Sequence, residues 1–97
     1  MKKEDFIINK YYAYEPDSRQ YIFIFNGFNS YGNIKTLRKY LCNDYLNSES
    51  SNFSSLNYGK YRTATQEEIN WLDACTEADK FIPLNEIKPK TLNYECY

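Results

Sequence analysis

The sequence predicts a small α+β domain in which an antiparallel sheet, open or partly closed like an SH3 barrel, carries one amphipathic helix in its C-terminal half. Its 97 residues suit a single domain. Aromatic residues make up 19% of the chain and favour strands. A helix start signal stands at Thr65–Glu68. We therefore expect a β-rich part over 6–63, a helix over 65–82 and an extended tail over 83–97.

The N-terminal third is predicted to form an antiparallel hairpin. Its strands are Phe6–Tyr14 and Arg19–Phe28, and the segment Glu15-Pro16-Asp17-Ser18 between them has the composition of a tight turn. Apolar side chains fall on both faces of the second strand, which indicates a strand in the middle of a sheet. One face carries Tyr21, Phe23 and Phe25, and the other carries Ile22 and Ile24.

The middle of the chain is less regular. Residues 26–33 have the composition of a loop, and Asn47–Asn57 suit a loop or a short edge strand. The segment Ile34–Cys42 fits helical and strand periodicity about equally, with the helical spacing slightly preferred. Tyr58–Thr63 is predicted to be the last strand, with Gly59 at a bulge or a close approach of two backbones.

The helix prediction rests on a capping box. The Thr65 hydroxyl is placed to accept from the Glu68 amide, while the Glu68 carboxylate reaches back to the Thr65 amide. Trp71 and Leu72 lie on the apolar arc of this helix and should anchor it to the sheet. Pro83 is expected to end the helix, and the tail beyond it to pack in part through Ile87, Leu92 and Tyr94.

Composition excludes several chemistries. The chain has no histidine, so neither a catalytic triad nor a histidine-ligated metal site is possible. Its three cysteines form no Cys-x-x-Cys pair, and their odd number suits a reducing cytosol. No phosphate-binding glycine loop or nucleophile elbow is present. We therefore expect a protein that is not an enzyme and uses no metal or cofactor.

Charge is divided unevenly along the chain, although the net charge is only −1. Residues 33–62 carry five basic and two acidic side chains, whereas 63–97 carry three basic and seven acidic ones. Basic residues interleaved with tyrosines suggest a face that stacks on bases and contacts phosphates. The candidate ligand-binding residues are Tyr31, Arg38, Lys39, Tyr40, Tyr58, Lys60, Tyr61 and Arg62.

Two further compositional features admit alternatives. The aromatic content looks too rich for the core of so small a domain and indicates an aromatic surface, although an AT-rich genome would produce the same bias. Acidic side chains over the predicted helix could mimic the phosphates of a nucleic acid, or simply keep that face soluble. These acids are Glu67, Glu68, Asp73, Glu77 and Asp79.

Residues 61–75 read Tyr-Arg-Thr-Ala-Thr-Gln-Glu-Glu-Ile-Asn-Trp-Leu-Asp-Ala-Cys. This stretch resembles a group of small proteins from phages of gut Bacteroidota, in which a β-rich part runs into an Ala-Thr-x-Glu-Glu-x-x-Trp-Leu-x-x-Cys helix. The resemblance implies a viral accessory protein and a strand over Ile34–Cys42. It implies no catalytic residue.

Together these features lead us to expect a phage accessory protein that binds and neutralises a bacterial immune component in the host cytoplasm. That component would be a nuclease complex or a cyclic-nucleotide signal. The alternatives are a structural or assembly protein of the virion, which would form an oligomer, and a module that binds single-stranded nucleic acid. The near-zero net charge makes a long nucleic-acid strand the least expected ligand. No membrane association is expected, since the longest apolar run is Tyr21–Phe25.

Overall fold

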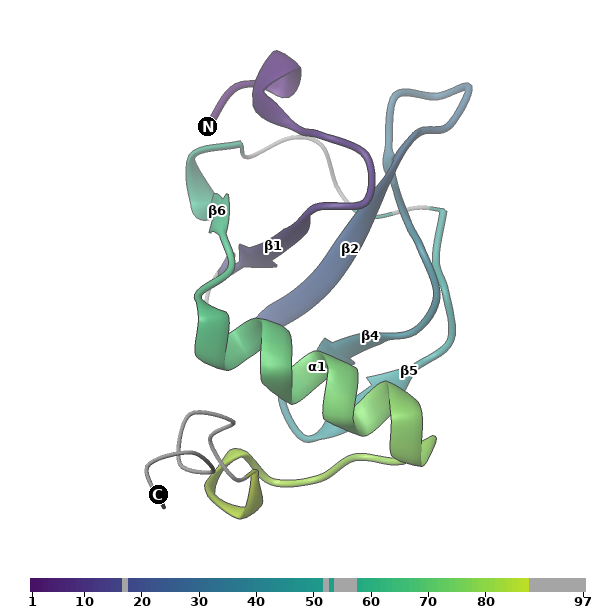
Figure 1. Cartoon of the computed structure of the whole chain (residues 1–97). Helices are drawn as coiled ribbons and strands as arrows, with labels where there is room; N and C mark the ends of the chain where they lie inside the picture. The colour runs from purple at the N-terminus through teal and green to yellow at the C-terminus, as the bar shows by residue number, and fades with distance from the viewer. Residues whose placement is uncertain (17, 52, 54–57, 88–97) are drawn as a thin grey trace, which may run out of the picture.

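A computed structural model describes residues 1–16, 18–51, 53 and 58–87. Within these ranges the chain forms six short strands, one α-helix and three 3-10 turns (Figure 1). The strands are β1 (Tyr11–Tyr14), β2 (Tyr21–Phe28), β3 (Ile34–Thr36), β4 (Tyr40–Cys42), β5 (Tyr45–Asn47) and β6 (Tyr61–Thr63). The helix α1 spans Gln66–Ala78, and the 3-10 turns η1, η2 and η3 span Lys3–Asp5, Tyr58–Lys60 and Leu84–Glu86.

The strands form an open antiparallel sheet in the order β5-β4-β2-β1-β6, with β3 also paired to β2. The predicted α+β class is therefore confirmed, with the sheet open and not closed into an SH3-like barrel. The predicted hairpin is also confirmed, because β1 pairs with β2 from Tyr11 opposite Ile24 to Tyr14 opposite Tyr21. The long strand β2 lies at the centre, as its two apolar faces indicated.

Both hairpin strands differ from their predicted bounds. The first begins at Tyr11 and not at Phe6, because the backbone turns before it: the Lys10 amide donates to the Ile7 carbonyl and Asn9 adopts φ 73°. The second begins at Tyr21 and not at Arg19, and it ends at Phe28 as predicted, so residues 26–28 belong to the strand and not to the loop considered for 26–33. Gly27, at φ 93°, lies where the register between β2 and β3 shifts. Asp17 of the predicted turn lies outside the described residues.

The ambiguous segment Ile34–Cys42 is extended, so the slight preference for a helix was wrong. It forms two strands, β3 and β4, which pair with successive parts of β2. Arg38 separates them at φ 63°, a left-handed conformation that breaks a continuous ladder. This break explains why neither periodicity fitted the whole segment. The strand β5, which pairs with β4 across the Asn43-Asp44 turn, was not predicted.

The last predicted strand is shorter than expected. Only Tyr61–Thr63 forms β6, which pairs with β1, while Tyr58–Lys60 forms η2. A Cβ at Gly59 would meet none of the described residues within 4 Å, so no close approach to them is seen. Phe53 forms an isolated antiparallel bridge with Ile34, which fits the short edge strand considered for 47–57. The rest of the segment predicted as a loop or short edge strand includes residues 52 and 54–57, which lie outside the described ranges.

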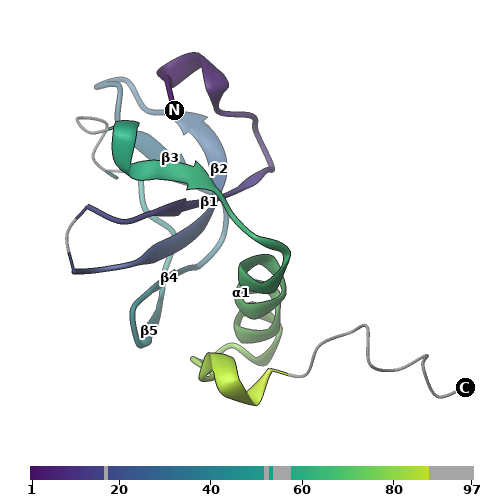
Figure 2. The same ribbon diagram turned by 90° about the vertical axis from the view of Figure 1, so that its left-hand side faces the viewer.

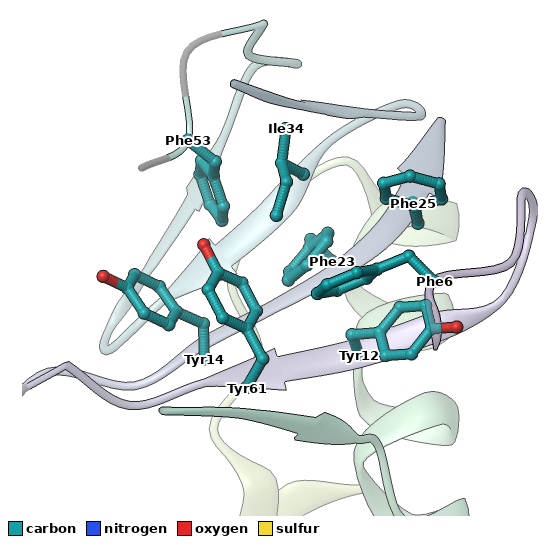
Figure 3. Packing of buried hydrophobic residues seen from close by; sticks show 8 residues of the cluster. All are labelled: Phe6, Tyr12, Tyr14, Phe23, Phe25, Ile34, Phe53 and Tyr61. Carbon is teal, nitrogen blue, oxygen red and sulfur yellow. The ribbon is translucent and has the colours of Figure 1, made fainter. Parts of the chain in front are cut away.

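Each face of the sheet buries its own core. The aromatic cluster on one face consists of Phe6, Tyr12, Tyr14, Phe23, Phe25, Ile34, Phe53 and Tyr61 (Figure 3). The helix-side cluster on the other consists of Ile22, Ile24, Leu41, Trp71, Leu72 and Cys75. Much of the aromatic content is therefore core, which corrects the inference that so many rings must form a surface.

The helix begins as predicted. Thr65 Oγ1 accepts from the Glu68 amide at 3.2 Å, and Glu68 Oε1 accepts from the Thr65 amide at 2.8 Å. Trp71 and Leu72 are buried in the helix-side cluster, as expected. Figure 2 shows α1 beside the sheet.

The end of the helix differs from the prediction, which placed it at Ile82. It ends at Ala78 because Asp79 turns left-handed at φ 57° and the Lys80 amide donates to the Cys75 carbonyl. Of the predicted extended tail, Leu84–Glu86 forms η3 and Ile87 packs on the helix-side cluster. Leu92 and Tyr94 lie outside the described residues. Within the described ranges, no helix combines the length and the apolar character that crossing a membrane requires.

Candidate functional site

The predicted ligand-binding residues do not form one surface. Side chains alternate across a strand, so neighbours in sequence lie on opposite faces of the sheet. Tyr40 packs on the aromatic cluster, whereas the next residue, Leu41, belongs to the helix-side cluster. Lys39 also lies on the helix side, where it forms an ion pair with Asp79 beyond the end of α1.

Tyr61 and Arg62 also lie on opposite faces of the sheet, and each already contacts other residues of the chain. The Tyr61 ring is only 3% exposed and stacks on Tyr14, with centroids 4.1 Å apart. Arg62 forms a two-pronged ion pair with Glu68, with N–O distances of 2.8 Å on both prongs, and its Nη2 also lies 3.4 Å from Glu15. Neither residue presents the free ring or free guanidinium that the prediction required.

The remaining candidates are dispersed. Tyr31 is 87% exposed in the loop between β2 and β3, and Lys60 is exposed at the end of η2. The side chain of Tyr58 lies outside the description. Neither Tyr31 nor Lys60 is among the described residues that line a hollow with Tyr40.

Arg38 and Lys39 do share a hollow, of about 370 Å³, with Ser48, Glu49 and Thr76. It lies beside the C-terminal half of α1. Glu49 also lines it and Asp79 is paired with Lys39, so two carboxylates balance the charge of the two cations. That charge balance makes the hollow a poor phosphate site.

A second hollow, about 350 Å³ in volume, opens at one end of the aromatic cluster. We call it the aromatic hollow, and it is lined by Tyr14, Pro16, Arg19, Tyr21, Tyr40, Ser50 and Phe53. Its residues come from the end of β1, the turn after it, the start of β2, the start of β4 and the segment that returns to pair with β3. Of the predicted residues it contains Tyr40 alone.

The rings around the aromatic hollow support one another. Tyr14 and Tyr21 face each other across the hairpin at 5.6 Å with an interplanar angle of 28°. Tyr21 and Tyr40 lie 6.3 Å apart. Phe53 meets Tyr40 edge to face at 4.8 Å and Tyr21 at 5.2 Å. Such contacts hold the rings in place before any ligand arrives.

The electrostatics of the aromatic hollow favour an anion or a neutral acceptor. Burial raises the pKa of the Tyr21 and Tyr40 phenols, so both stay protonated at neutral pH. Arg19 lines the same hollow, and its charge acts in the opposite direction on the pKa of Tyr21. Arg19 itself is exposed at the rim. The hollow thus combines aromatic walls with a cation and with phenol hydroxyls, of which that of Tyr21 is hydrogen-bonded to Cys42.

Sequence reasoning missed Arg19, Tyr14 and Tyr21 as site residues, although a signal for them was available. The predicted turn over 15–18 would place Tyr14 opposite Arg19, with Tyr21 two residues further along the same face; in the structure the connection is longer and Tyr14 pairs with Tyr21. Two tyrosines at a closing pair lie on the same face of the sheet and must meet. Phe53 and Ser50 carried no comparable signal, because the long loop between β5 and η2 has no regular periodicity.

The five acidic residues of the predicted helix differ in their surroundings. Glu68 is buried in the ion pair with Arg62, Asp79 is paired with Lys39, and Asp73 accepts a hydrogen bond from the Tyr11 hydroxyl. Three of the five acids therefore have partners within the chain. This distribution counts against a continuous row of free carboxylates that mimics nucleic-acid phosphates.

No known protein family, characterised protein or solved structure matches the chain. Evidence for its function therefore comes from its own residues.

Proposed function

We propose that this protein is a non-enzymatic phage accessory protein that neutralises a bacterial immune component by capturing a nucleotide signal in the aromatic hollow. The observation that carries the proposal is the convergence of Tyr14, Tyr21, Tyr40 and Phe53 around an open hollow with Arg19 at its rim. A base would stack against the half-buried rings of Tyr21 and Tyr40, and the Arg19 guanidinium would meet a phosphate.

The energetics suit a small ligand. Base stacking on an aromatic side chain contributes about 1–3 kcal/mol per base. The rings are held by their mutual contacts and lose little freedom on binding, so more of that energy appears as affinity. A single arginine at the rim favours a compact nucleotide over a long strand, whose affinity depends on many phosphate contacts.

Binding without turnover is supported by the residues themselves. The chain has no histidine to act as a general base at neutral pH. Glu68, the buried carboxylate of the helix, is held ionised by Arg62 and is not poised for acid–base work. The resemblance of residues 61–75 to small phage proteins supports the viral setting, in which sequestration of a signal is sufficient to block a defence.

Calorimetry with a panel of cyclic mono-, di- and trinucleotides tests the proposal. We expect at least one member to bind, and Tyr40→Ala and Arg19→Ala each to weaken it by about tenfold or more. Tyr45→Ala is the matched control, since Tyr45 is 70% exposed and lies outside the aromatic hollow. Absence of heat with every nucleotide would reject nucleotide capture, and so would equal losses in the Tyr40 and Tyr45 variants.

A further inference from the structure

A groove of about 410 Å³ lies on the other side of the molecule, between α1 and the segment that follows it. That segment runs back along the helix after the turn at Asp79 (Figure 1). We call this feature the helix groove, and it is lined by Asn70, Asp73, Ala74, Glu77, Ala78, Ile82, Glu86 and Ile87.

The walls of the helix groove are fixed by contacts with the core. Trp71 Nε1 donates to the Ile82 carbonyl at 2.6 Å, and the Ile82 amide donates to Cys75 Sγ at 3.3 Å. Ile82 and Ile87 pack on the helix-side cluster while remaining half-exposed. These contacts make the groove part of the folded structure. Its apolar floor is formed by Ile82 and Ile87 together with Ala74 and Ala78.

The charged side chains described at the rim of the helix groove are all acidic. Asp73, Glu77 and Glu86 contribute three carboxylates, and no lysine or arginine is among the described residues that line it. Asp73 and Glu77 are four residues apart and so lie on the same side of the helix. The last turn of α1 also has no basic residue, and the negative end of the helix dipole adds to the field.

From the apolar lining and the acidic rim together we infer that the helix groove docks a basic amphipathic segment of a partner protein. Apolar side chains of that segment would lie against Ala74, Ala78, Ile82 and Ile87, and its lysines or arginines would meet the carboxylates of Glu77 and Glu86. Asp73, which also accepts a hydrogen bond from the Tyr11 hydroxyl, would add its negative charge. The inference does not depend on the nucleotide proposal, because the helix groove lies on the helix side and the aromatic hollow on the opposite face of the sheet.

Fluorescence anisotropy with a labelled amphipathic leucine–lysine helical peptide tests this docking. We expect saturable binding that weakens as salt is raised, and amide chemical shifts that change at Asn70, Ala74 and Ala78. Glu77→Lys and Glu86→Lys should each weaken binding by about tenfold. Glu67→Lys is the matched control, because Glu67 is an exposed acid of the same helix that does not line the groove.

Two peptides with altered chemistry complete the test. A leucine–glutamate peptide and a serine–lysine peptide should both bind at least about tenfold more weakly, because one lacks the charge and the other the apolar face. Equal loss with Glu67→Lys, or equal binding of the serine–lysine peptide, would show attraction by net charge alone and overturn the inference. A dimer in light scattering that Glu77→Lys dissociates would assign the groove to a second copy of the chain and overturn it as well.

Discussion

The two faces of the sheet bury different kinds of side chain. Seven of the eight buried members of the aromatic cluster are phenylalanine or tyrosine, whereas Trp71 is the one aromatic member of the helix-side cluster. The coverings differ too. A regular helix lies over one face, while Phe6 after η1, Ile34 of β3 and Phe53 pack over the other (Figure 3).

This difference shows how a short chain can close a core without a second helix. Large rings reach across the gaps between irregular segments, so a few residues fill the space that a helix fills on the opposite face. The covering remains incomplete where Tyr14, Tyr21 and Tyr40 meet, and the aromatic hollow opens there. The same packing that stabilises this face thus leaves ring surface accessible to a ligand.

The largest expected effect compares the centres of the two clusters. Phe23 and Leu72 are both fully buried. We expect Phe23→Ala to cost roughly 4 kcal/mol in the free energy of unfolding and Leu72→Ala roughly 3 kcal/mol, because the larger side chain leaves the larger cavity. Urea unfolding followed by circular dichroism measures both.

Tyr45→Ala provides the reference for that pair. Its side chain is exposed, so the variant should stay within about 0.5 kcal/mol of the parent. If Leu72→Ala proves more costly than Phe23→Ala, the helix-side cluster is the main source of stability and the comparison between the faces is reversed.

A smaller effect is expected at the junction of the two regions, where Arg62 of β6 meets Glu68 of α1. Replacing the buried carboxylate by Glu68→Gln should cost roughly 2 kcal/mol at neutral pH, because Arg62 and the Thr65 amide lose a charged acceptor. Glu67→Gln removes an exposed charge next to it and serves as the control. Thermal and urea unfolding of both variants measure the difference.

The pH dependence of that difference has a defined sign. The hydrogen bonds from Arg62, more than any other cause, lower the pKa of Glu68 in the folded state. The ionised Glu68 carboxylate therefore makes its full contribution to stability above the ordinary glutamate pKa of about 4.3. That contribution is lost as the pH falls through the lowered pKa of the folded state. The gap between parent and Glu68→Gln should narrow only in acid. A gap that is constant down to the lowest pH at which both fold would contradict this assignment.

The smallest expected effect separates ring stacking from simple burial. A double-mutant cycle with Tyr14→Leu and Tyr61→Leu should give a coupling energy of about 0.5–1.5 kcal/mol, since the rings are parallel within 11°. The helix-side pair Trp71 and Phe81, at 6.1 Å and 66°, should couple less. Equal coupling in the two pairs would show that ring packing does not distinguish the faces.

Local signals predicted the elements whose stability is local. The hairpin followed from the turn at 15–18 and the alternating strand after it, and the start of α1 followed from Thr65 and Glu68. The end of the helix could not be predicted in the same way. Its apolar arc continued to Ile82, but the chain leaves the helix at Asp79 and brings Ile82 to Trp71 through a reversed segment.

The candidate site was less accessible to prediction because it depends on contacts between distant segments. Proximity in sequence grouped Tyr40 with Arg38 and Lys39, and Tyr61 with Arg62, yet alternation along the strands separates these neighbours. Phe53 reaches the aromatic hollow only because its segment pairs with Ile34.

By itself the sequence determined the class of fold, the central two-faced strand and the capped helix, since each depends on side-chain periodicity or on hydrogen bonds between residues a few positions apart. Only the tertiary structure decided which tyrosines are core and which line a hollow, and which acids are paired. Those outcomes depend on side chains from segments far apart in the chain, and spacing along the sequence does not encode that proximity.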